Sequence, residues 1–233
     1  VAVMEDELLL GEYILNHKKT HSQKIMTMIE QILSELELTV QDIDIFAAAI
    51  GPGSFTGLRI GVATVKALAH ATGKPVILLL VDGRAATINW AERYIPGIVH
   101  AWFPGEFMGD AVAQVLFGDY NPGGKLAVTF PRSVGQIPFA FPFKPGSDSK
   151  GFVRVTGTLY PFGYGLSYTT FAYSDLKIEN PVIGVQGSVK LSCKVKNTGK
   201  VAGNEVVQLY LHDEMSSVTT YVKVLRGFER IHL

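Results

Sequence analysis

Asp82, Arg84 and Glu106 are the side chains of this sequence whose types and spacing best suit polar chemistry. Asp82 and Arg84 follow the apolar run 76–81, at the expected C-terminal end of a strand, where open α/β sheets place their ligands. Glu106 stands four residues before Asp110 at an expected helix start, so the two carboxyl groups could share one face. Carboxyl groups placed in this way can act as nucleophiles or as general acids and bases.

Each of these side chains also has a purely structural explanation. The helix dipole favours acids at a helix N-terminus, which accounts for Glu106 and Asp110 without any reaction. Asp82 and Arg84 could form an ion pair or stabilise a turn. We therefore name no catalytic residue, and we keep Asp82, Arg84 and Glu106 as candidates for residues that lie close to a ligand.

The glycine-rich string GPGSFTG at 51–57 stands between an expected strand and an expected helix. In this arrangement backbone N–H groups and a helix N-terminus can face an anion. A tight turn that lets helix and strand pack closely explains the string as well. No Lys-Ser/Thr pair closes it as in a Walker A motif, and the sequence predicts no metal site and no cofactor. The candidate residues of this loop are Gly51, Gly53, Ser54, Thr56, Gly57 and Arg59.

The elements expected to position these residues alternate between strands and helices up to residue 130. Hydrophobic periodicity predicts strands at 1–4, 8–15, 43–50, 76–81, 98–103 and 126–130, of which 43–50 should be buried. It predicts helices from about residue 22, at 39–42 with a capping box, from 58, at 89–93 and through 112–116. This alternation indicates a mainly parallel sheet that is covered on both faces.

The downstream part of the sequence differs in composition and in hydrophobic pattern. Pro, Gly, Phe and Tyr dominate 131–165, which we interpret as a connecting segment whose aromatic residues lie on a neighbouring domain. After Tyr168, short strands and turns predict an all-β sandwich of immunoglobulin or fibronectin type. Apolar and polar residues alternate in 189–196, so Cys193 is expected on the inner face of that sandwich.

Composition excludes several classes of protein. Lys+Arg and Asp+Glu both number 21, which gives no electrostatic support for nucleic acid or an anionic membrane as a partner. No run approaches the roughly 18 apolar residues of a membrane span, and no signal peptide is present. The single cysteine excludes an internal disulfide framework. Both ends stop inside strand-like patterns, so we expect a truncated sequence whose downstream sandwich has an unpaired edge.

Residues 1–77 resemble the first half of TsaB, a bacterial protein of tRNA threonylcarbamoyladenosine biosynthesis. The resemblance lies in NHKKTHS at 16–22 and above all in IGPGSFTGLRIG at 50–61. It implies a partial actin/Hsp70-like fold, a non-catalytic role, a TsaD-like protein as partner and a cytoplasmic location. The first strand of that family, its Asp-Thr turn and its second lobe are absent from this sequence.

Residues from about 73 to the end resemble the C-terminal part of glycoside hydrolase family 3, of the β-glucosidase type. The strings that carry the resemblance are AWFPGE at 101–106, LFGDYNPGGKL at 116–126, TFPR at 129–132 and YPFGYGLS at 160–167. NTG at 197–199 and LRGF at 225–228 fit the fibronectin type III-like domain that ends many members. This resemblance implies a carbohydrate partner and a periplasmic or secreted location.

The same resemblance implies that this chain lacks both catalytic carboxyl groups of the family. Retaining glycoside hydrolysis uses one carboxyl group as nucleophile and another as acid and base. The nucleophilic Asp of the family lies in an N-terminal barrel that is absent here. The acid/base Glu lies upstream of the strand that matches 76–81, where TsaB-like residues stand instead.

The two resemblances meet at GKPVI, residues 73–77, which fits both. We therefore expect a fusion that is α/β first and all-β afterwards. Its function by resemblance is hydrolysis of β-glucosides, with no activity for the chain alone. The alternatives are an interaction module for a TsaD-like partner and an accessory module that binds sugar. The expected parts are a TsaB-like fragment at 1–77, a fragment of the parallel-sheet α/β sandwich at 73–132, a connecting segment at 133–167 and a truncated fibronectin type III-like sandwich at 168–233.

Overall fold

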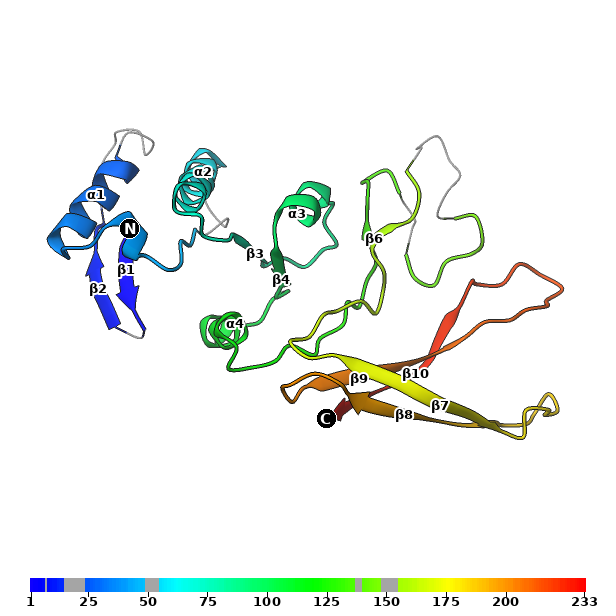
Figure 1. The fold of residues 1–233 in the computed structure, drawn as a ribbon. Coiled ribbons are helices and arrows are strands. Elements are labelled where there is room, and N and C mark those ends of the chain that lie inside the picture. Colours follow the sequence, from blue (N-terminus) through cyan, green and yellow to red (C-terminus); the bar gives the residue numbers. More distant parts are fainter. Residues whose placement is uncertain (7, 15–23, 49–54, 137–139, 148–154) are drawn as a thin grey trace. The chain divides into compact units, whose positions relative to one another are not determined.

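A computed structural model describes the chain except for residues 7, 15–23, 49–54, 137–139 and 148–154. The fold divides into two compact units, shown as a ribbon in Figure 1. One unit comprises Val1–Leu78 and Tyr94–Val99. The other comprises Leu79–Arg93 and His100–Leu233.

The first unit begins with an antiparallel hairpin and a helix, as the sequence predicts. Strands β1 (Ala2–Glu5) and β2 (Leu8–Glu12) pair, and α1 (Ile25–Glu35) follows. Gly11 lies against this helix, because a Cβ at that position would come 3.3 Å from Cδ1 of Ile32. The small residue therefore lets the hairpin and the helix approach closely.

The capping box predicted at 39–42 is confirmed, whereas the buried strand predicted after it is wrong. The 3₁₀ helix η2 (Val40–Asp42) has Thr39 as its N-cap, and the Asp42 carboxylate accepts from both the amide and the hydroxyl of Thr39. Residues 43–48 form no strand, and Ile45 is 60% exposed. Among the described residues β1 pairs with β2 and β3 (Ile77–Leu80) with β4 (Gly97–His100), and none of these strands pairs with 43–48.

Helix α2 (Phe55–Thr72) confirms the helix predicted from residue 58 and starts earlier. It ends where Gly73 adopts a left-handed φ of 71°, a conformation that suits glycine. The Lys74 amide then donates to the Ala69 carbonyl at 3.0 Å. None of the described helices is long and apolar enough to cross a membrane.

Two short paired strands lie in the middle of the chain. Strand β3 (Ile77–Leu80) is followed by α3 (Asn89–Tyr94), and β4 (Gly97–His100) then pairs with β3. Gly97 lies against Ile77, and the Ala101 amide donates to the Leu80 carbonyl at 2.9 Å, so the two strands run in the same direction. Helix α4 (Met108–Phe117) comes next and confirms the predicted helix.

The large parallel sheet expected from the alternation is reduced, in the described residues, to the pair of β3 and β4. The strand predicted at 126–130 is largely wrong, since β5 is Phe130–Pro131 and pairs with β6 (Thr158–Tyr160). The backbone of Leu126 explains the difference. Its amide donates to the Tyr164 carbonyl and its carbonyl accepts from the Gly163 amide, so this stretch bonds to the aromatic segment downstream of it.

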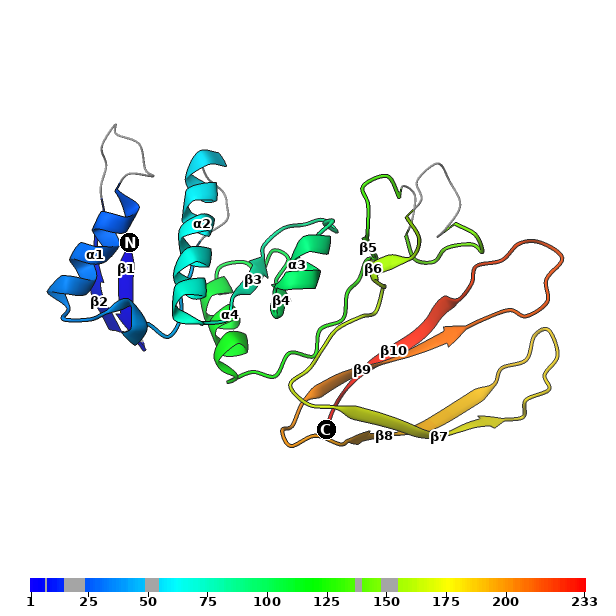
Figure 2. The ribbon, with the colours of Figure 1, turned by 45° about the horizontal axis from the view of Figure 1, so that its top comes forward.

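The end of the chain is all-β, as predicted. Two antiparallel pairs form it in the described residues, and Figure 2 shows both pairs. The first pair is β7 (Phe171–Glu179) with β8 (Lys190–Asn197), and the second is β9 (Asn204–Leu211) with β10 (Val224–His232).

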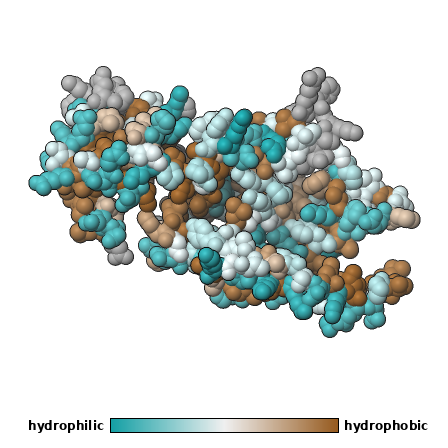
Figure 3. Space-filling view, in the orientation of Figure 1, coloured by the Kyte–Doolittle hydropathy of each residue, from teal (hydrophilic) through white to brown (hydrophobic). Residues whose placement is uncertain are grey.

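The prediction that Cys193 faces the interior is wrong, because its side chain is exposed. The register of β7 against β8 breaks between Ser174 and Lys177, so no residue of β7 stands in register opposite Cys193. Apolar side chains are also visible between polar ones on the face drawn in Figure 3. Val182 and Val185, which follow β7, are 91% and 100% exposed.

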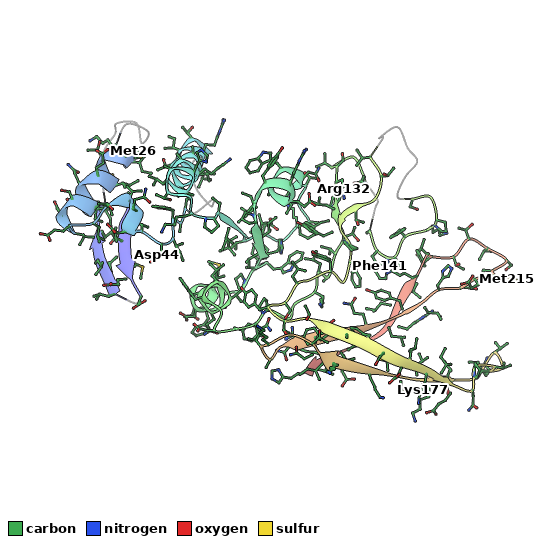
Figure 4. All side chains as sticks on the ribbon, viewed as in Figure 1. Met26, Asp44, Arg132, Phe141, Lys177 and Met215 are labelled. Carbon is green, nitrogen blue, oxygen red and sulfur yellow. The ribbon has the colours of Figure 1, made fainter. Side chains whose placement is uncertain are left out.

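The connecting segment packs on β9 through aromatic rings. Phe141, labelled in Figure 4, stacks on Phe162 with ring centroids 4.3 Å apart and meets Tyr210 edge-on at 5.7 Å. The Gln208 side-chain amide donates to the Gly163 carbonyl at 3.0 Å. Phe141 thus lies against the β-rich part, as the sequence suggested for the aromatic residues of this segment.

Candidate functional site

Asp82 and His100 form the best-defined polar pair at the ends of β3 and β4. Asp82 lies two residues beyond the end of β3, and His100 is the last residue of β4. The His100 Nε2 atom lies 3.1 Å from Asp82 Oδ1. Because an ionised carboxylate can only accept, Nε2 carries the proton of this hydrogen bond. Parallel strands therefore deliver both groups to one edge, where α/β sheets place ligands.

A second donor fixes the same carboxylate oxygen. The Arg84 backbone amide donates to Asp82 Oδ1 at 3.1 Å, which closes a turn at the end of β3. No described residue donates to the other oxygen, Oδ2, and the Asp82 side chain remains 36% exposed. The carboxylate is thus held through one oxygen, while the other can accept from a ligand.

Aromatic rings enclose the imidazole of His100, whose side chain is 8% exposed. The Trp102 ring meets it edge-on with centroids 4.1 Å apart, and the Phe130 ring does so at 5.2 Å. The Nδ1 atom of His100 is buried and has no hydrogen-bond partner within the described part of the chain. Leaving such an atom unpaired costs about 1–3 kcal/mol, so its presence requires an explanation.

The backbone after His100 is strained, and an exposed aromatic ring follows it. Trp102 has a φ of 57°, a conformation that costs a bulky residue on the order of 1–3 kcal/mol. Phe103 is 76% exposed, and its ring lies so close to Gly83 that a side chain there would collide with it. The exposed ring of Phe103 therefore lies beside Gly83, the residue that follows Asp82, and an apolar ring near a polar group is common in ligand sites.

The structure brings Asp82 and Arg84 together, but no described contact joins Glu106 to either of them. Glu106 is exposed and precedes α4, whereas Asp110 lies in the first turn of that helix. In the predicted glycine-rich loop, Gly51, Gly53 and Ser54 lie outside the described residues, and Thr56, Gly57 and Arg59 belong to the start of α2. The described residues contain no group of three side chains that could hold a metal ion.

Sequence reasoning missed His100. The available signal was a single polar residue at the end of the apolar run 97–100, directly before the AWFPGE string. Hydrophobic periodicity does not identify the partner of a single histidine in an apolar strand. The contact with Asp82 depends on the pairing of β3 with β4, which the local sequence does not specify.

Comparison with known proteins finds a family that these residues resemble. Residues 59–168, which contain Asp82, His100 and Phe103, match the Glycosyl hydrolase family 3 C-terminal domain. This segment is similar to the C-terminal part of glycoside hydrolase family 3. Residues 205–233 of the same chain match the fibronectin type III-like domain, so the family 3 region continues into the β-rich end.

Curated relatives of the family 3 region are named as β-xylosidases and β-glucosidases. A β-xylosidase of Formosa agariphila is 49% identical over 168 residues, covering 70% of this chain and 23% of the relative. A periplasmic β-glucosidase of Salmonella typhimurium is 47% identical over 174 residues, again covering 70% and 23%. The chain thus spans about a quarter of the length of these relatives.

Solved structures of β-glucosidases resemble this chain over a longer stretch. A β-glucosidase from Listeria innocua in complex with glucose has a TM-score of 0.69 and 28% identity, and it covers 88% of this chain and 31% of its own. One from Erythrobacter marinus has a TM-score of 0.69 and 33% identity, covering 88% and 30%. Residues 59–233 make up less than 88% of the chain. The structural similarity therefore extends upstream of residue 59, where the family 3 match begins.

A second and weaker similarity covers the upstream part. Residues 9–80 match the family of tRNA N6-adenosine threonylcarbamoyltransferase, TsaD. This range overlaps the family 3 match over residues 59–80, the stretch that contains the GKPVI string. The actin/Hsp70-like fold expected for the upstream part is not confirmed by these comparisons.

Proposed function

We propose that the family 3 region of this chain acts in the breakdown of β-glycosides by supplying sugar-binding groups. The observation that carries the proposal is the match of residues 59–168 to the family 3 C-terminal domain, with Asp82 and His100 paired inside it. The relatives named as β-glucosidases and β-xylosidases support a β-linked sugar as the ligand. Because the chain spans about a quarter of these relatives, their whole activity is not assigned to it.

The chemistry of the site suits a sugar hydroxyl. Asp82 Oδ2 can accept from a hydroxyl group while Oδ1 is held by His100 and by the Arg84 amide. The exposed ring of Phe103 can lie against the apolar face of a pyranose, and the exposed Arg84 side chain can donate to a second hydroxyl. Polar contacts would then set orientation, and the ring would supply apolar contact.

Hydrolysis by these residues alone is not part of the proposal. Glycosidases need two carboxyl groups about 5–5.5 Å apart for retention or about 6.5–9.5 Å apart for inversion. Oδ1 of Asp82 already accepts hydrogen bonds from the His100 ring and from the Arg84 backbone amide. No described contact joins Glu106 to Asp82. We infer that the 233-residue chain binds a β-glycoside without cleaving it.

Calorimetric titration of the purified chain with cellobiose and with xylobiose tests this function. We expect binding that Asp82→Asn weakens by about tenfold, since one charge-assisted hydrogen bond is lost. Asp119→Asn is the matched control, because Asp119 is an exposed acid of the same segment with no described partner. Absence of binding to either disaccharide, or equal weakening by both variants, would refute the proposed function.

A second candidate function concerns the upstream part and rests on the TsaD-family match of residues 9–80. We propose that residues 1–77 form a partial actin/Hsp70-like segment that binds a TsaD-like protein. A pull-down with a purified TsaD protein tests this function, with a chain that begins at residue 81 as the control. Retention of the shorter chain on the TsaD resin, or release of both chains, would exclude it.

A further inference from the structure

His100 combines three features that packing alone does not explain. Its side chain is more than nine-tenths buried between the rings of Trp102 and Phe130. Its single described polar contact is the hydrogen bond to Asp82 Oδ1. Its second ring nitrogen, Nδ1, is buried without a partner among the described residues. A phenylalanine at this position would fill the same aromatic surroundings without leaving a buried nitrogen unpaired.

The direction of the hydrogen bond follows from the acceptor. Nε2 must carry a proton in order to donate to the Asp82 carboxylate. The rings of Trp102 and Phe130 pack against the imidazole, so it is a hydrogen-bond donor held in one orientation.

We propose that His100 is a positioning residue that orients Asp82 for a sugar hydroxyl. The proposal rests on the sugar site described above and adds the group that holds it in place. The two hydrogen bonds to Oδ1, from the His100 ring and from the Arg84 amide, restrict rotation of the carboxylate and leave Oδ2 without a described donor. An acceptor fixed before binding loses less freedom when the ligand arrives.

The same geometry defines the class of ligand. Oδ2 of an ionised carboxylate only accepts, so its partner must donate, as a sugar hydroxyl does. Phe103, whose ring lies over the neighbouring Gly83, offers an apolar surface beside that acceptor. The ligand is therefore a hydroxyl-bearing ring with one apolar face, such as a β-linked glucoside or xyloside.

Two substitutions separate positioning from packing. His100→Gln keeps an N–H donor close to the place of Nε2 but loses the aromatic ring, whereas His100→Phe keeps a ring and loses the donor. We expect His100→Gln to bind cellobiose within about threefold of the wild type, and His100→Phe to bind about tenfold more weakly. We also expect His100→Phe to melt at or above the wild-type temperature, because the unpaired nitrogen is removed.

Calorimetric titration with cellobiose and thermal melting of the whole chain supply these measurements. A His100→Gln variant that binds as weakly as His100→Phe would overturn the proposal. So would a His100→Phe variant that binds as well as the wild type, since the ring would then suffice. Melting curves confirm that each variant is folded before its affinity is compared.

Nuclear magnetic resonance of the imidazole nitrogens tests the positioning even if no sugar binds. We expect the wild type to show a proton on Nε2 that exchanges slowly with solvent, and we expect Asp82→Ala to accelerate this exchange. A chain that binds neither disaccharide but shows these signals would refute the sugar site while keeping the hydrogen bond between His100 and Asp82. A proton on Nδ1 in place of Nε2, or exchange that Asp82→Ala leaves unchanged, would overturn the assignment of His100.

Discussion

Lys125 Nζ lies 3.1 Å from Glu205 Oε2, and the two side chains are only 16% and 11% exposed. The ammonium group donates its hydrogen bond to the Gly165 carbonyl at 3.0 Å and faces Oε2 as a charge contact. Tyr173 completes the cluster by donating its hydroxyl to Glu205 Oε1 at 2.8 Å. Lys125 belongs to the match with the family 3 domain, and Glu205 begins the match with the fibronectin type III-like domain. This cluster therefore ties the two family segments together.

Removing one partner of this ion pair should destabilise the fold strongly. Lys125→Met leaves the Glu205 carboxylate nearly buried without a counter-charge, which costs about 3–5 kcal/mol. Lys190→Met is the matched control, because Lys190 pairs with Glu179 at 3.3 Å while both side chains are more than half exposed. Loss of that exposed pair should cost about 0–1 kcal/mol.

Urea unfolding of both variants measures the difference. The expected result is a large drop in the free energy of unfolding for Lys125→Met and little change for Lys190→Met. Equal effects would show that the buried pair does not hold the two segments together.

Alkaline pH should weaken the same cluster through Tyr173. Burial raises the pKa of the Tyr173 phenol above its usual range, and its hydrogen bond to Glu205 adds to the effect. In the unfolded chain the phenol loses its proton near pH 10, about the usual tyrosine pKa, while in the folded chain it keeps the proton to higher pH. The contribution of Tyr173 to stability is therefore full below about pH 10 and is lost as the pH rises beyond it.

Tyr173→Phe isolates this contribution, because the ring remains and the titrating group is removed. Unfolding by urea between pH 8 and pH 11 should show a steeper alkaline loss for the wild type than for Tyr173→Phe. Tyr210 serves as a control for the hydrogen bond to Glu205. Burial alone raises the pKa of the Tyr210 phenol, whereas the pKa of Tyr173 is raised by burial and by that hydrogen bond. Parallel curves for the wild type and Tyr173→Phe would rule out the linkage.

Gly83 should matter for sugar binding more than for stability. A methyl group at this position would collide with the ring of Phe103, whose exposed side chain can swing away at little cost. We therefore expect Gly83→Ala to change the free energy of unfolding by less than about 1 kcal/mol but to weaken cellobiose binding several-fold. The reason is that the apolar ring leaves its place beside Asp82.

Gly109→Ala provides the comparison for that experiment. Outside the helix's own backbone, no atom of the described residues lies within 4 Å of a Cβ built at Gly109, and the residue belongs to α4. Alanine there should stabilise the helix by roughly 0.5–1 kcal/mol and leave cellobiose affinity unchanged. If Gly83→Ala bound cellobiose as well as Gly109→Ala does, Phe103 would have no part in the site.

The helices and the final strands could be predicted from the sequence because their signals are local. The 39–42 capping box and the helix-ending Gly73 act within a few residues, and both are present. Pairing between distant segments is not local, and two predicted strands were wrong for this reason. The apolar run 43–48 has the composition of a strand but no paired neighbour, and residues 126–129 bond to the aromatic segment near Tyr164 instead of extending a sheet.

The candidate site was predictable in part for the same reason. Asp82 and Arg84 could be named because they follow an apolar run at a strand end, and their mutual contact is a turn of three residues. His100 depends on the pairing of two strands, and its burial depends on Trp102 and on Phe130, thirty residues further along. Neither the strand pairing nor the packing of these rings on His100 can be predicted from hydrophobic periodicity in the sequence.

Incubation of the purified chain with an aryl β-glucoside tests the central claim most directly, with a full-length family 3 β-glucosidase as the positive control. The predicted result is cellobiose binding in calorimetry without release of the aryl group above the buffer rate. Release of the aryl group by the pure chain, abolished by Asp82→Asn or Glu106→Gln, would contradict the account.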